Sequence, residues 1–122
     1  YWTYGEYLGI GPGAHGRMER AGQRYAQHAA AQPEKWLSAI EATGAAGWSE
    51  TRLTPEETID EAILLGLRLA SGIESRTLEK LTGRPGFSSL NQQTCLELQE
   101  EGLLKISQTC LKATAQGWKM LN

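Results

Sequence analysis

A glycine-rich segment that follows several aromatic residues and contains a histidine is the part of this sequence best suited to hold a cofactor. A backbone without side chains lets a ring or a second backbone approach closely, and an imidazole among glycines can reach a metal or a carboxylate. We therefore treat residues of this segment as candidates for cofactor binding: Tyr1, Trp2, Tyr4, Gly11, Gly13 and His15. The competing interpretation of His15 is an exposed side chain with local hydrogen bonds.

The stretch Gly11–Gly16 also matches the glycine spacing of a dinucleotide-binding turn. Such a turn requires a helix directly after it and a second strand that ends in an acidic residue about 20 positions later. The polar residues after Gly16 do not predict that helix. Close packing of backbones at a barrel strand is the preferred interpretation of the glycines.

Three arginines recur at helical spacing after the glycines, at Arg17, Arg20 and Arg24. On one helix face they could bind carboxylates or phosphates. A solvated face with a salt bridge to Glu19 is the simpler explanation, and we favour it. The second histidine, His28, is interpreted as an ordinary surface residue.

Motifs for catalysis or structural metal binding are missing from this sequence. Cys95 and Cys110 lack the spacing of a zinc site or a disulfide framework, and Cys95 shares an apolar stripe with Leu98. We expect no catalytic residue and no metal site in these 122 residues. The cysteines fit a reducing, cytoplasmic compartment.

The charge and hydropathy of the chain argue against membrane and nucleic-acid partners. The net charge is −2, and the longest mainly apolar run, Ala62–Ala70, is too short to cross a bilayer. We expect neither a membrane span nor a nucleic-acid surface. The sequence begins abruptly with apolar residues and no Met, so we expect it to be part of a longer protein.

The first half of the sequence predicts few regular elements. Tyr7–Ile10 reads as a short buried strand, residues 11–16 as a loop, and residues 17–32 as a loop with at most one short strand or helical turn. Pro33 at the first position and Gly44 at the end predict a helix between them. Residues 45–53 read as a linker.

The second half predicts three helices, a hairpin and a last helix. The helices cover residues 54–70, 74–81 and 89–101, the hairpin pairs residues 103–106 with 110–113, and Thr114 begins the last helix. This order is typical of a winged-helix domain. The third helix would face DNA, yet residues 85–104 contain no Lys or Arg and three Glu, which argues against DNA binding.

Several segments resemble the oxygen-independent coproporphyrinogen III oxidase family, in particular its branch of HemW-like heme chaperones. The similar segments are Tyr7–Arg17, Pro33–Leu37, Glu61–Leu69 and the region around Gly72 and Ile73. Members of this family are radical-SAM proteins, whose N-terminal partial barrel holds an iron–sulfur cluster on three cysteines and binds S-adenosylmethionine. The resemblance implies that this chain lacks that part, together with the His-Asn pair that precedes Tyr-Trp in the heme chaperones.

The resemblance implies a mainly α fold with a small β component, in which a winged-helix-like C-terminal domain follows a terminal barrel strand and loop. Residues 1–32 would be the remnant of the last barrel strand with its glycine-rich loop, residues 33–53 a connecting helix and linker, and residues 54–122 the C-terminal domain. The implied function is to close the active site of the N-terminal radical-SAM domain, with porphyrin or heme as ligand. S-adenosylmethionine and the cluster would belong to the parent protein, an oxidase or a heme chaperone. The alternative is a stand-alone winged-helix interaction module without catalysis.

Overall fold

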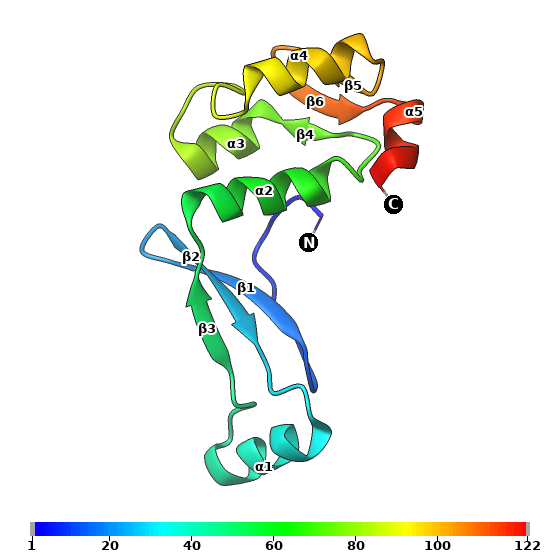
Figure 1. Cartoon of the computed structure of the whole chain (residues 1–122). Coiled ribbons are helices and arrows are strands. Elements are labelled where there is room, and N and C mark those ends of the chain that lie inside the picture. The colour runs from blue at the N-terminus through cyan, green and yellow to red at the C-terminus, as the bar shows by residue number, and fades with distance from the viewer. Residues whose placement is uncertain (1, 122) are drawn as a thin grey trace. The chain divides into compact units, whose positions relative to one another are not determined.

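The computed structural model describes residues 2–121, which form two compact units. The first unit contains residues 5–54, and the second contains residues 2–4 together with the chain from Pro55 onward. Figure 1 labels the helices and strands of both units. Each unit is described by itself below.

The first unit is built on a three-stranded antiparallel sheet. Its strands are β1 (His15–Arg20), β2 (Gln23–His28) and β3 (Ser49–Arg52), in the order β1-β2-β3. Ala21 and Gly22 join β1 to β2, and both have positive φ, 51° and 73°. Two such residues form the tight loop that suits the twist of a hairpin.

This sheet corrects two sequence interpretations: residues 17–32, read as a loop with at most one short strand or helical turn, contain most of two strands, and residues 45–53, read as a linker, contain a third. A two-residue hairpin loop usually carries Asn-Gly or Asp-Gly, and Ala-Gly gives no such signal. The strands also lack an apolar alternation, because their faces carry mostly polar side chains. The helix α1 (Pro33–Thr43) is confirmed, with Pro33 in its first turn and Gly44 at its end in the left-handed conformation, φ 70°.

The predicted buried strand at Tyr7–Ile10 is wrong. Tyr7 makes one isolated bridge to Arg17, with N–O distances of 3.0 and 2.9 Å, and Leu8 and Ile10 are 66% and 94% exposed. The glycines do permit a close approach, because a Cβ on Gly9 would overlap the carbonyl oxygen of His15. The neighbour is thus the chain's own backbone.

The three arginines do not share a helix face, because Arg17 and Arg20 lie on β1 and Arg24 lies on β2. Arg20 pairs with Glu50 rather than with Glu19. The Arg24 side chain is 8% exposed, and its Nη2 donates to the Gly5 carbonyl oxygen at 2.8 Å. The Arg24 carbonyl oxygen accepts from the Leu53 N–H at 2.9 Å. Arg24 therefore fastens both ends of the first unit to β2.

The second unit combines four α-helices with a small sheet. Its elements are α2 (Pro55–Gly66), β4 (Ile73–Glu74), α3 (Ser75–Thr82), α4 (Gln92–Glu100), β5 (Leu104–Ile106), β6 (Cys110–Ala113), α5 (Ala115–Trp118) and a final 3-10 turn η1 (Lys119–Leu121). The sheet order is β4-β6-β5, all antiparallel. The predicted helices and hairpin are present, with helix bounds shorter than expected at 54–70 and 89–101.

Strand β4 was not predicted, because two residues carry no periodicity. Ile73 pairs with Leu111 and is 4% exposed, while Leu78 and Leu111 are 0% and 2% exposed. These side chains form the core of the second unit together with Ala62 and Tyr4. Over residues 2–121, no helix is long and apolar enough to cross a membrane.

Candidate functional site

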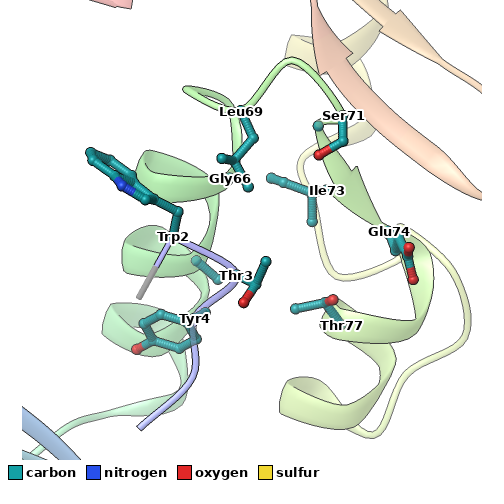
Figure 2. A pocket seen from close by; sticks show the side chains of 11 residues that line it. Trp2, Thr3, Tyr4, Gly66, Leu69, Ser71, Ile73, Glu74 and Thr77 are labelled. Atoms are coloured by element: carbon teal, nitrogen blue, oxygen red, sulfur yellow. The ribbon is translucent and has the colours of Figure 1, made fainter. Parts of the chain in front are cut away.

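A cavity of about 200 Å³ lies within the second unit, between α2, β4 and the N-terminal residues. Figure 2 shows the segment with Trp2 and Tyr4 beside α2, across from Ile73 and Thr77. The lining is apolar on α2 and at Ile73, and Glu74 adds a carboxylate. Small-molecule pockets usually measure about 300–1,000 Å³. The cavity can therefore enclose an edge of a large ligand but not the whole of it.

Tyr4 fixes the N-terminal wall of this cavity. Its side chain is 6% exposed, and its hydroxyl donates to Glu61 Oε2 on α2 at 2.8 Å. Its backbone has a φ of 63°, in a region that non-glycine residues seldom adopt. Burial of the ring and the bond to a carboxylate stabilise this conformation. Trp2, by contrast, is 46% exposed.

Gly66, at the end of α2, lies in the lining of the cavity next to Ile73. A Cβ at this position would overlap Ile73 Cγ1, so the two elements can meet here only because Gly66 has no side chain. Strand β4 therefore packs against the bare backbone of α2 at this position. The glycine that weakens the helix by its propensity thus allows Ile73 to enter the core.

The other predicted site residues lie in the first unit, and Tyr1 lies outside the described residues. Gly11 and Gly13 have φ values of 103° and 71°, and the Gly13 N–H donates to the Ala30 carbonyl oxygen at 2.9 Å. They turn the chain from the Tyr7–Ile10 segment into β1. His15 begins β1 and is exposed.

His15 lies directly opposite His28 in the β1–β2 register, and their rings stack with centroids 4.4 Å apart and an interplanar angle of 21°. Sequence reasoning missed this pair because it did not predict the hairpin. Cross-strand neighbours that lie thirteen positions apart become visible only once the turn at Ala21 is recognised.

The cysteines are both free and partly buried. Burial raises the pKa of the Cys95 thiol, which disfavours the reactive thiolate. Among residues 2–121, no three His, Cys, Asp or Glu side chains come together as a metal site would require.

The comparisons with known proteins agree with this architecture. The family model of the HemN C-terminal domain matches residues 53–119. The structure of coproporphyrinogen III oxidase (HemN) from Escherichia coli, described as a radical SAM enzyme, superposes with a TM-score of 0.66. That superposition covers 95% of this chain and 26% of the oxidase at 16% identity, which shows a shared fold.

Curated relatives are similar along the whole chain. Radical S-adenosyl methionine domain-containing protein 1, mitochondrial, from Bos taurus is 30% identical over 100% of this chain and 29% of its own length. Heme chaperone HemW from Bacillus subtilis is 29% identical over 96% of this chain and 30% of its own length.

The chain thus spans less than a third of these relatives. The family model covers more than half of the chain and contains every helix and strand that surrounds the cavity. The chain belongs to the HemN C-terminal domain family and is a HemN- and HemW-like C-terminal region.

Proposed function

We propose that this chain closes the active site of an N-terminal radical-SAM domain in a longer protein of porphyrin or heme metabolism. The exposed apolar side chains of Leu8 and Ile10 carry this proposal, because they belong to the segment that resembles the last barrel strand. Large apolar side chains that are exposed next to one another favour burial against another surface. The coverage of less than a third of each relative supports such a surface in the parent protein.

The test is a pair of substitutions in the full-length gene product. Ile10→Asp should reduce S-adenosylmethionine cleavage or tetrapyrrole binding at least tenfold, because a carboxylate would be buried at the docking surface. The matched control is Leu37→Asp on α1, where the side chain is 51% exposed outside that segment. Equal activity of both variants would contradict the proposal.

The fold of the second unit supports a winged-helix-like assignment. Its order of α2, β4, α3, α4 and the β5–β6 hairpin follows the helix, strand, helix, helix, hairpin order of such domains. In this assignment α4 would be the helix that faces a partner. Its acidic residues favour a protein contact over a nucleic acid. A stand-alone interaction module without catalysis is the second candidate, and a full-length gene product that showed neither S-adenosylmethionine cleavage nor tetrapyrrole binding would favour it.

The candidate cofactor residues divide between two roles in this proposal. Trp2 and Tyr4 form an aromatic wall that receives an apolar edge of the tetrapyrrole, because Glu74 at the cavity repels its carboxylates. In the first unit, and independently of that cavity, Gly11 and Gly13 shape the segment that precedes His15, whose imidazole would be available to a heme iron.

A heme titration followed by the Soret band tests the role of His15. We expect weak binding, with a dissociation constant no better than roughly micromolar, since a single exposed imidazole contributes one ligand. His15→Ala should weaken it further, whereas His28→Ala should leave it nearly unchanged. Tight binding lost with His28→Ala would assign the iron to the other histidine.

We propose a reducing, cytoplasmic compartment for the same protein. The free state of Cys95 and Cys110 supports it. The relative from Bos taurus is named as mitochondrial, so fractionation of the native host is the appropriate measurement.

A further inference from the structure

The β1–β2 hairpin brings the only two histidines of the sequence together on one face of the first unit. Both side chains are exposed, and their rings stack with centroids 4.4 Å apart. The pair lies outside residues 53–119, which the family model matches, and neither histidine lines the cavity in the second unit. Two adjacent imidazoles are a chemically specific arrangement, because imidazole is a ligand that Zn²⁺, Cu²⁺ and Ni²⁺ prefer.

The ladder places the two side chains as close as an antiparallel pair allows. The Ala29 N–H donates to the Ala14 carbonyl oxygen at 2.9 Å, so the Ala14–Ala29 pair is hydrogen-bonded. Because such pairs alternate along an antiparallel ladder, His15 and His28 form a non-hydrogen-bonded pair, in which side chains lie closer together. Both histidines are exposed to solvent.

We propose that His15 and His28 together bind a divalent transition-metal ion of the imidazole-preferring class. Zinc–nitrogen bonds of about 2.0–2.1 Å in tetrahedral geometry place two ligand nitrogens roughly 3.3 Å apart. Rotation of two exposed rings from their stacked arrangement reaches that separation without moving the strands. With two protein ligands, water completes the coordination, so the ion binds at an open, exchangeable site.

The side chains next to the two histidines determine which groups could bind the ion with them. Arg17 lies two positions along β1 on the same face, and its Nη1 donates to the Gly16 carbonyl oxygen at 2.8 Å. Ser49 lies opposite His28 on β3, and its hydroxyl donates to the His28 carbonyl oxygen at 3.3 Å. No carboxylate is in register with the pair on β1, β2 or β3. The imidazoles are therefore the ligands, and binding requires their neutral form.

Ring nitrogen NMR of the untagged, ¹⁵N-labelled chain tests the site directly, because only two imidazoles contribute. On titration with Zn²⁺, the ring signals of both histidines should shift with one common midpoint, and Mg²⁺ should shift neither. His15→Ala should weaken the response of His28 at least tenfold, and His28→Ala should do the same to His15. Glu19→Gln, which removes a carboxylate from β1, should leave the midpoint unchanged.

Three outcomes would overturn the proposal. One is a Zn²⁺ response of a single ring, and another is an unchanged His28 midpoint in a folded His15→Ala variant. The third is a loss of affinity in Glu19→Gln as large as in His15→Ala. The result of the heme titration does not decide this proposal, since heme iron would take one imidazole and the divalent ion would take both.

Discussion

Gly66 is the residue on which the core of the second unit depends most directly. Any side chain there would overlap Ile73, which is 4% exposed in β4. We expect Gly66→Leu to lower the free energy of unfolding by about 1–3 kcal/mol or more through overpacking. Thermal and urea denaturation of the chain measure the effect.

The matched control for Gly66→Leu is Asp60→Leu, at an exposed position of the same helix. It introduces the same leucine side chain at a position where no neighbour must move. The free energy of unfolding of this variant should therefore stay within about 0.5 kcal/mol of the parent value. If Gly66→Leu melted at or above the temperature of the parent, Ile73 would not pack against α2 as described.

At the scale of elements, the β1–β2 hairpin contains a residue in an unfavourable conformation. Ala21 has a φ of 51°, a region that Asn and Gly adopt far more readily than Ala. Ala21→Asn should therefore raise the stability of the first unit by about 0.5–1 kcal/mol. Amide hydrogen exchange of β1 and β2 would report slower opening, and faster exchange would contradict the assigned turn.

In β3, the carboxylate of Glu50 accepts hydrogen bonds from Arg20 on β1 and Gln27 on β2. Hydrogen bonds from Gln27, first, and from Arg20 hold the pKa of Glu50 below its ordinary value of 4.5. A lowered pKa in the folded state means that the contribution to stability is present above the unfolded pKa and is lost as pH falls through the folded one. Because Glu50 is solvent-exposed, the effect is small.

A carboxyl NMR titration of Glu50 checks this pH dependence. In Gln27→Ala the midpoint should move upward toward the ordinary value, and the melting temperatures of parent and variant should converge in acid. A larger movement in Arg20→Gln than in Gln27→Ala would reverse the order of the two causes.

The same sheet marks the limit of what sequence could predict. The α1 and α5 boundaries were predictable because Pro33, Gly44 and Thr114 act through local backbone geometry, and Thr114 does accept from the Gly117 N–H. Strands β1 to β3 were not, because their side chains are mostly polar and show no alternation of apolar and polar residues. The sequence made Tyr4 a candidate site residue, but its bond to Glu61 depends on a contact 57 positions away and could not be predicted.

At the scale of the whole molecule, the chain alone should not perform radical chemistry. It contains two cysteines, whereas the cluster implied by its family resemblance requires three. After anaerobic reconstitution with iron and sulfide, we expect no cluster absorbance and no cleavage of S-adenosylmethionine. A brown protein with about one cluster per chain would refute this expectation.

The attachment of Tyr4 to α2 makes the first unit an insertion within the second, and this couples the two through chain entropy. Joining Tyr4 to Glu61 closes a loop of 57 positions, which costs about 3–4 kcal/mol for a flexible chain. Arg24 binds both Gly5 and Leu53, so the folded first unit already holds the ends of that loop together. Residues that stabilise only the first unit thereby lower the entropy cost of forming the Tyr4–Glu61 contact in the second unit.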